Sequence, residues 1–201
     1  MTHDQALSEL KEGNRRFREN QMTHPRQDPA TRKERAILAE PFAVILTCAD
    51  SRVAPEIIFD QGIGDLFTVR VAGNVALGDE IASVEYAIEQ FHTPLCVVMG
   101  HTGCRAVEAA LSGKRFPFDL DQLLKQIRVV SEQVRRERPK LVGAELAAAV
   151  MRRNVFESVE EIGRRSRVTR NVQILGAEYQ VDSGKVVWLD ASHSAPLFLV
   201  G

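Results

Sequence analysis

The sequence predicts an α/β fold in which helices flank a mostly parallel central sheet, with four parallel strands and an antiparallel fifth. Four short strand-like runs alternate with segments of helical periodicity, as in β-α-β units. Two of these runs, 42–47 and 95–99, are almost continuously apolar, which is typical of parallel strands buried on both faces. The fourth run is followed by a short turn at 182–184 and another strand-like run, which should therefore pair antiparallel.

The N-terminal part is predicted to form an arm ahead of the sheet. Residues 4–20 place Leu7, Leu10 and Phe17 near one helical face, giving an amphipathic helix whose apolar stripe is too narrow to be stable alone. Residues 21–41 contain three prolines among charged residues and are expected to be a loop. Residues 1–41 should therefore pack as a helical arm on another surface.

The remaining elements follow in order along the chain. The strands are expected at 42–47, 66–71, 95–99, 172–176 and 185–189, and the helices at 53–60, at 78–91 and in several pieces between 105 and 163. Connections of this length allow neighbouring strands to be parallel. No repeat or domain boundary is visible, so residues 1–201 are expected to form a single domain.

Composition narrows the function classes. Apolar residues make up 44% and charged residues 26% of the chain, as in ordinary soluble proteins, and the longest apolar run, 42–49, is too short to span a bilayer. A net charge of −1 offers no general attraction to nucleic acid or to an anionic membrane. Charged residues near the start argue against an export signal, so a cytoplasmic location is expected. Three cysteines are too few for a disulfide framework and are expected to bind metal or to be buried.

Residues suited to metal chemistry follow two of the predicted strands. The first strand runs into Cys48-Ala-Asp-Ser-Arg52, and the third into Gly100-His-Thr-Gly-Cys104. The carboxyl ends of parallel strands meet at one edge of the sheet. Cys48, His101 and Cys104 would supply the three sulfur and nitrogen ligands of a catalytic Zn²⁺ site that leaves its fourth position open.

Asp50 and Arg52 are expected to be the catalytic pair beside this metal. In an extended segment they would project to the same side as Cys48. The Asp50 carboxylate could be a fourth ligand in an inactive state, unless a charge-assisted bond from Arg52 holds it away from the metal.

The cysteines also have a simpler interpretation, because cysteine is often an ordinary buried residue. The combination of Cys48 and Cys104 with His101 favours metal binding, whereas Cys96 lies inside an apolar run and is expected in the core. The other histidines are His3, His24, His92 and His193. They have no second potential ligand at a convincing spacing, so they are expected in surface or loop positions. A role for one of them as a proton shuttle is left open.

The paired motifs at 48–52 and 101–104 resemble the signature of the β-class carbonic anhydrases. The segments 57–74 and 83–87 extend the likeness, and 10–17 and 176–184 resemble the bacterial branch of that family. The resemblance implies a zinc enzyme that reversibly hydrates carbon dioxide to bicarbonate and a proton, by hydroxide formed from water on the metal. Because two of the ligands are thiolates, activity should favour alkaline pH.

The resemblance also implies an assembly and a substrate pocket. The protein would be a homodimer or tetramer with zinc at the subunit boundary and with the arm 1–41 packed on the partner subunit. Phe67 and Tyr86 would wall an apolar pocket that Gly103 and Arg105 complete, with the backbone N–H of Arg105 donating to bicarbonate. No nucleic acid or membrane partner is implied.

The sequence departs from the family pattern at two places. Arg105 stands where the family usually has glycine, and Ala39 and Glu40 stand where a glutamine often contacts bicarbonate. Two alternatives therefore remain open. One is a carbonyl sulfide or carbon disulfide hydrolase on the same scaffold, and the other is a zinc-binding or anion-binding homologue without turnover.

Overall fold

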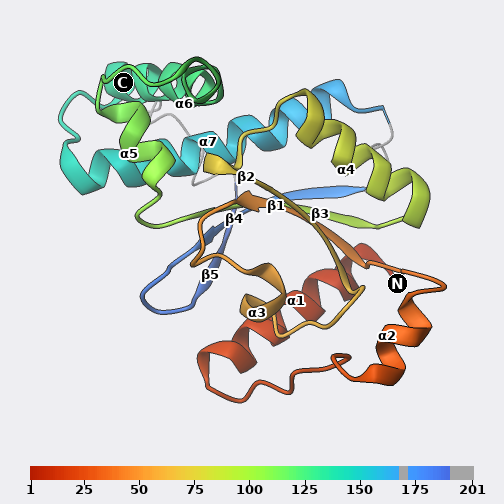
Figure 1. Cartoon of the computed structure of the whole chain (residues 1–201). Helices are drawn as coiled ribbons and strands as arrows, with labels where there is room; N and C mark the ends of the chain where they lie inside the picture. Colours follow the sequence, from red (N-terminus) through yellow and green to blue (C-terminus); the bar gives the residue numbers. More distant parts are fainter. Residues whose placement is uncertain (168–171, 191–201) are drawn as a thin grey trace.

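A five-stranded sheet with the order β2-β1-β3-β4-β5 runs through the centre of the computed structural model, which describes residues 1–167 and 172–190 (Figure 1). The strands are β1 (Ala43–Cys48), β2 (Leu66–Val71), β3 (Leu95–His101), β4 (Gln173–Tyr179) and β5 (Val186–Leu189). The first four are parallel to their neighbours, and β5 pairs antiparallel with β4. The predicted fold class is confirmed.

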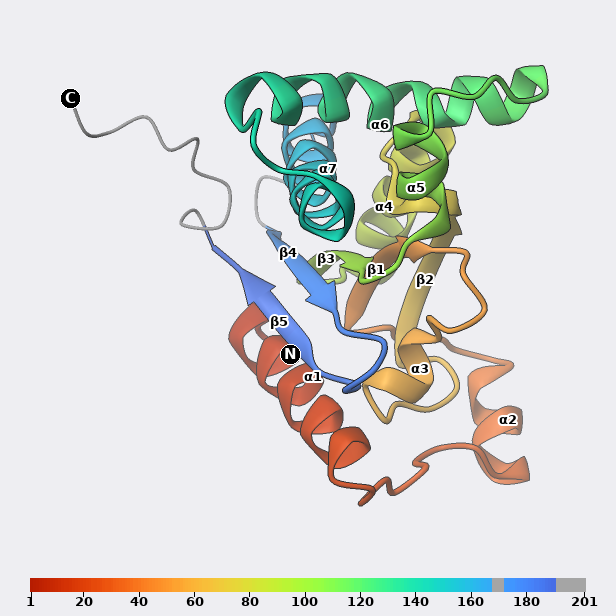
Figure 2. The same cartoon turned by 90° about the vertical axis from the view of Figure 1, so that its left-hand side faces the viewer.

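Helices cover both faces of the sheet (Figures 1 and 2). The helices α4, α5, α6 and α7 lie on one face, and α1, α2 and α3 lie on the other side. In chain order they are α1 (His3–Arg18), α2 (Pro29–Arg35), α3 (Pro55–Ile58), the 3-10 turn η1 (Ala72–Asn74), α4 (Gly78–Phe91), α5 (Arg105–Leu111), α6 (Phe118–Glu137) and α7 (Gly143–Arg165).

Alternate residues of the central strands point into two separate cores. Val44 and Leu46 of β1 pack with α4 to α7, whereas Ala43 and Ile45 pack with α1 and α3. Because both faces are covered, every residue of β1 and β3 is buried, which explains why these strands are apolar without alternation.

The sheet order creates a crevice at the carboxyl end of β1. From β1 the chain crosses to β2 on one side, whereas β3 lies on the other side of β1. The connections that follow β1 and β3 therefore diverge, and ligands of open α/β sheets bind where this happens. Both predicted motifs follow these two strands.

Two helices differ from the expectation. Helix α2 lies within the segment predicted to be a loop, and it is capped by Asp28, whose Oδ1 accepts the N–H groups of Ala30 and Thr31 at 2.8 and 3.1 Å. With seven residues this helix is too short to show a periodic apolar pattern, so its N-cap and Pro29 are the sequence features that indicate it. Helix α3 is shorter than the predicted 53–60.

The helix of the predicted arm packs on its own chain. The Asn14 side chain of α1 donates to the carbonyl oxygens of Ile58 and Gly184 at 3.1 and 2.8 Å, and its Oδ1 accepts the N–H of Val186 at 3.0 Å. These bonds tie α1 to α3 and β5. Contact of the arm with a partner subunit stays a prediction.

Among the described residues, none of the helices combines the length and apolar character that a membrane crossing needs. Three of the histidines expected in surface or loop positions belong to the described part, whereas His193 lies outside it.

Candidate metal centre

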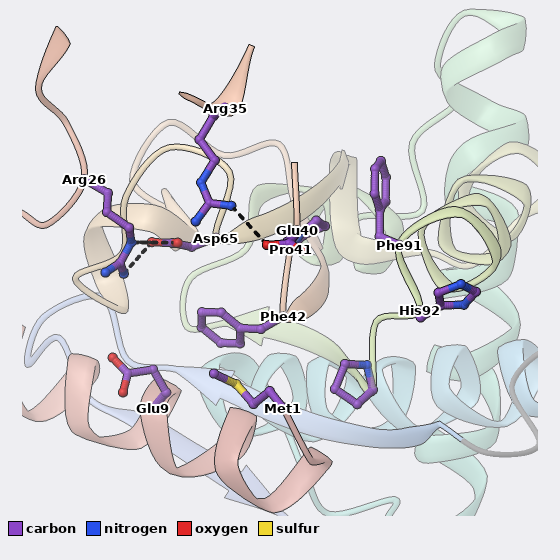
Figure 3. A pocket seen from close by; sticks show the side chains of 11 residues that line it. Met1, Glu9, Arg26, Arg35, Glu40, Pro41, Phe42, Asp65, Phe91 and His92 are labelled. Carbon is purple, nitrogen blue, oxygen red and sulfur yellow. Dashed lines mark hydrogen bonds and ion pairs between the residues drawn. The ribbon is translucent and has the colours of Figure 1, made fainter. Parts of the chain in front are cut away.

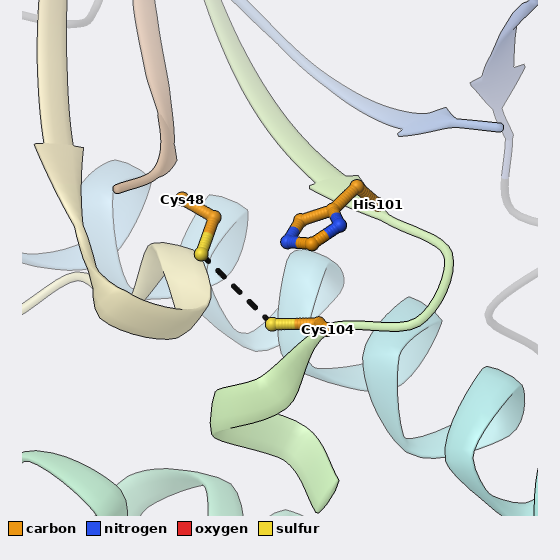
Figure 4. A group of neighbouring side chains, drawn as sticks. All are labelled: Cys48, His101 and Cys104. Atoms are coloured by element: carbon orange, nitrogen blue, oxygen red, sulfur yellow. Dashed lines mark hydrogen bonds between the residues drawn. The ribbon is translucent and has the colours of Figure 1, made fainter. Parts of the chain in front are cut away.

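Three potential metal ligands meet at the carboxyl ends of β1 and β3 (Figure 4). Cys48 is the last residue of β1, His101 is the last residue of β3, and Cys104 caps the N-terminus of α5. Their ligand atoms lie within 4.8 Å of one another, and the two sulfur atoms are 3.9 Å apart. All three side chains are buried. The structure thus brings together the three residues that the sequence singles out.

The geometry of this cluster fits a zinc ion. Zn–S bonds of about 2.3 Å in a tetrahedral shell place two sulfur atoms roughly 3.8 Å apart, close to the observed 3.9 Å. The His101 Nδ1 atom lies 3.0 Å from the carbonyl oxygen of Thr102, which orients the ring, and its Nε2 is buried without a hydrogen-bond partner. A cation between the sulfurs would give that nitrogen a partner.

The two thiols differ in acidity. Contact with the Cys104 thiol lowers the pKa of Cys48 despite its burial, and the nearby His101 ring and the Gly73 N–H act in the same direction. The Cys48 thiolate and burial raise the pKa of Cys104 above its ordinary value. Cys48 is therefore the stronger acid of the pair, and a bound cation would favour the thiolate form of both.

Asp50 and Arg52 form a two-pronged ion pair beside the cluster. Nε and Nη2 of Arg52 donate to the two carboxylate oxygens of Asp50 at 2.9 and 2.7 Å. The same Nη2 donates to the carbonyl oxygen of Gly103 at 3.0 Å, which ties the pair to the turn that carries Cys104. The Arg52 guanidinium holds the pKa of Asp50 well below its usual range, so the carboxylate is ionised. Its Oδ2 lies 3.9 Å from His101 Nε2.

The segment after Cys48 is a turn, so the expectation that Asp50 and Arg52 lie in an extended segment with Cys48 was wrong. The Val53 N–H donates to the carbonyl oxygen of Asp50 at 3.0 Å, and the Arg52 N–H donates to the Asp50 carboxylate at 2.9 Å. Asp50 uses its side chain to close a local turn, as aspartate often does. Asp50 and Arg52 are neighbours because of this turn and not because of strand alternation.

Arg70 of β2 is a further part of the site that sequence reasoning missed. Its Nη2 donates to the carbonyl oxygen of Asp50 at 2.7 Å, and its Nε donates to that of Cys48 at 3.3 Å. Arg70 thereby holds the backbone that carries the Cys48 sulfur and the Asp50 carboxylate. A signal was present, since Arg70 is the one charged residue in the otherwise apolar or neutral strand Leu66–Val71.

The structure places Phe67 and Tyr86 apart from the cluster of their own chain. Phe67 pairs with Val44, four residues before Cys48 in the register of β1 and β2, a separation of about 13 Å along a strand. The rings of Phe67, Tyr86 and Phe91 lie 6.0–6.2 Å from one another, and Tyr86 is 56% exposed. These residues form an aromatic cluster on β2 and α4 in which Phe67 and Phe91 are partly buried and Tyr86 is exposed.

Gly103 and Arg105 flank Cys104. Gly103 adopts a left-handed φ of 64°, which lets the turn double back towards Arg52. Arg105 is the first residue of α5, and its side chain is 86% exposed, with Nε 3.9 Å from a Glu108 oxygen. A cavity of about 300 Å³ adjoins this turn between α5 and α7, and its apolar lining includes Val107, Ala144, Ala147, Ala148 and Met151.

A larger cavity, of about 670 Å³, lies at the opposite ends of the strands, near Phe42 before β1 and Pro94 before β3 (Figure 3). Its charged residues are largely paired with one another, Arg26 with Asp65 and Arg35 with Glu40. Within the described residues, the one group of three or more side chains placed to hold a metal is Cys48, His101 and Cys104. None of these three side chains lines the larger cavity.

Comparisons with known proteins agree with this geometry. The sequence model of a family described as carbonic anhydrase matches residues 43–186. Carbonic anhydrase 2 of Mycobacterium tuberculosis is 38% identical, with 92% of each chain covered. The crystal structure of the β-carbonic anhydrase CafA of Aspergillus fumigatus is similar, with a TM-score of 0.76, 30% identity and coverage of 81% of this chain and 82% of that one. A tetrameric β-carbonic anhydrase of Sordaria macrospora shares the fold, with a TM-score of 0.74, 22% identity and coverage of 81% and 87%.

Proposed function

The chain belongs to the β-carbonic anhydrase family of enzymes, and we propose that it reversibly hydrates carbon dioxide to bicarbonate and a proton. The reaction uses one Zn²⁺ ion, held by Cys48, His101 and Cys104. The observation that carries the proposal is the convergence of these three buried ligand atoms within 4.8 Å, beside an ion-paired carboxylate. Two sulfurs and one imidazole nitrogen leave a fourth position for the reaction.

Asp50 and Arg52 have different roles beside the metal. When bound, zinc would supply a Lewis acid that lowers the pKa of water and so makes it a nucleophile. Asp50, ionised and with Oδ2 3.9 Å from His101 Nε2, accepts a hydrogen bond from the reacting water and orients it. Arg52 engages both carboxylate oxygens of Asp50 and so keeps that carboxylate from becoming a fourth ligand.

Substrate binding uses the space beside the metal turn. The cavity of about 300 Å³ is lined mainly by small apolar side chains of α5 and α7, which suits a small uncharged molecule such as carbon dioxide. The backbone N–H of Arg105 receives the bicarbonate product, as the family resemblance implies. This N–H opens α5, where the first N–H groups have no partner within the helix.

The active form is a homo-oligomer, a dimer or a tetramer. The distance of Phe67 and Tyr86 from the ligands of their own chain supports a role for this aromatic pair in walling the pocket of a neighbouring subunit. The tetrameric relative of Sordaria macrospora supports the same conclusion. The three unpaired cysteines are consistent with a reducing, cytoplasmic location.

A stopped-flow assay of carbon dioxide hydration across pH, with zinc content measured on the same sample, tests this function. The expected result is one zinc per chain and activity that increases towards alkaline pH. Parallel assays with carbonyl sulfide and carbon disulfide test the alternative hydrolase. Zinc-loaded protein that hydrates no carbon dioxide at any pH would refute the proposed reaction.

A further inference from the structure

The η1 turn after β2 contributes a backbone donor to the metal centre. The Gly73 N–H donates to the Cys48 Sγ at 3.3 Å. Gly73 and Asn74 both adopt left-handed φ values, 76° and 46°, which turn the backbone inwards. A Cβ atom at Gly73 would lie 2.6 Å from Ile127 Cδ1, so the backbone packs directly against α6 at this point. The sulfur of Cys48 therefore has a hydrogen-bond donor that no side chain supplies.

Helix α7 holds this turn from the other side. Asn154 Nδ2 donates to the carbonyl oxygen of Gly73 at 2.8 Å, and the two residues are 81 positions apart in the sequence. One helical turn further on, Ser158 Oγ donates to the carbonyl oxygen of Asn74 at 3.1 Å. Both side chains are buried. Gly73 is thus held at its carbonyl by α7 while its N–H faces the Cys48 sulfur.

We propose that Asn154 is a positioning residue for the metal ligand Cys48, acting through the Gly73 backbone. This inference rests on the proposed metal site. A hydrogen bond to a thiolate withdraws electron density that the sulfur would otherwise donate to the metal, and a centre with two thiolates is sensitive to that loss of donation. Asn154 therefore influences the metal from a position that touches neither the ion nor its ligands.

Ser158 supplies a matched control. It lies on the same face of α7 and donates the same kind of bond to the next carbonyl of the same turn. The N–H that reaches Cys48 belongs to Gly73, however, and Asn154 bonds to the carbonyl of that residue, whereas Ser158 bonds to the carbonyl of Asn74. A general loosening of the contact between η1 and α7 would follow from either substitution, whereas a specific effect on the sulfur would follow from Asn154 alone.

The test compares Asn154→Leu with Ser158→Ala in zinc-bound and cobalt-substituted protein. Leucine is similar in size, and it removes the Asn154 Oδ1 atom, which is buried without a partner, so the variant should fold. Zinc affinity is measured by competition with a chromophoric chelator, and the thiolate-to-cobalt charge-transfer band is recorded. For Asn154→Leu we expect a shifted band and about tenfold weaker zinc binding, and for Ser158→Ala an unchanged band and unchanged affinity.

Equal bands and affinities in Asn154→Leu and wild type would overturn the inference, and so would the same shift in both variants. If Asn154→Leu does not fold, Asn154→Ser is measured in its place. In addition, wild-type protein loaded with ¹¹³Cd is examined for scalar coupling between the metal and the Gly73 amide proton. Absence of that coupling also overturns the inference. A wild-type chain that binds neither zinc nor cobalt refutes the proposed function as well, whereas stoichiometric zinc with unaltered Asn154→Leu refutes the inference alone.

Discussion

Two arginines hold Asp50 in different ways. Arg52 binds the carboxylate, whereas Arg70 binds the carbonyl oxygens of Asp50 and Cys48. The first contact determines what the carboxylate can do, and the second determines where the backbone lies. Loss of Arg52 should therefore affect the reaction more than the binding of the metal.

Arg52→Ala should lower carbon dioxide hydration by about 10-fold to 100-fold, because a carboxylate without its partner is free to approach the metal. Zinc content should stay at one per chain. Both quantities are measured on the same preparation by stopped-flow assay and elemental analysis. The exposed Arg135→Ala in α6 serves as the control and should behave as wild type. Wild-type turnover in Arg52→Ala would rule out this role.

At the scale of single residues, the predicted metal ligands can be recognised in the sequence, but the groups that hold them in place cannot. Cys48, His101, Cys104, Asp50 and Arg52 could be named because their side-chain chemistry and their positions after apolar strands are both visible in the sequence. The Gly73 N–H could not be predicted as part of the site, because every residue except proline has a backbone N–H and only the fold determines which of them lies near the Cys48 sulfur. The contact between Asn154 and Gly73 joins segments 81 positions apart and leaves no local pattern.

The N-terminal arm shows what sequence periodicity misses at the scale of single elements. The ends of α4 at 78 and 91 were predicted correctly, because its apolar positions recur over several turns. Helix α2 has seven residues, and Asp28 at its cap defines its start. The segment that leads to it is held by the buried Asp60, which accepts the N–H groups of Thr23 and His24, each at 3.0 Å, and the Arg16 Nε at 2.6 Å.

The attachment of the arm should weaken in acid. Burial raises the pKa of Asp60, but the bonds from Thr23, Arg16 and His24 outweigh it and lower the pKa to about 2. Since this value lies below the ordinary value of about 4, the ionised carboxylate stabilises the arm fully at higher pH, and this stabilisation is lost as pH falls from about 4 to 2. The protection factors of the arm amides, which are exchange rates corrected for the intrinsic effect of pH, should therefore fall over this range.

Asp60→Asn tests that assignment. The amide cannot accept the same set of bonds, so the protection factors of the arm amides should be lower than in wild type already at pH 6, and the further fall between pH 4 and pH 2 should largely disappear. Asp119→Asn, at an exposed position of α6, is the control and should retain the wild-type profile. An unchanged profile in Asp60→Asn would assign the acid sensitivity to another group.

At the scale of the whole molecule, the sheet order separates the metal ligands from the aromatic cluster. The ligands lie at the carboxyl ends of the strands, whereas Phe67 lies four residues earlier in the register of β1 and β2. The sequence predicts both groups, and the resemblance assigns them to one pocket. Since a single chain keeps them about 13 Å apart along the strand, the pocket that the resemblance implies would need residues from two subunits.

Hybrid oligomers test this arrangement. Cys48→Ser subunits should lack zinc, and Phe67→Ala subunits should keep zinc but have a damaged pocket wall. When the two inactive variants are dissociated and reassembled together, activity should rise above that of either alone, because some sites combine an intact metal centre with an intact aromatic wall from the neighbour. No gain on mixing, with hybrid formation verified by mass spectrometry, would place both groups in the site of one subunit.

The most direct test of the metal centre is X-ray absorption at the zinc edge, on wild type and on Cys48→Ser, with Cys96→Ser as the matched buried-cysteine control. We expect wild type and Cys96→Ser to show two sulfur neighbours at about 2.3 Å and two nitrogen or oxygen neighbours at about 2.0–2.2 Å. Cys48→Ser should show a loss of bound zinc. A wild-type shell without sulfur, or one of four sulfurs, would contradict the proposed site.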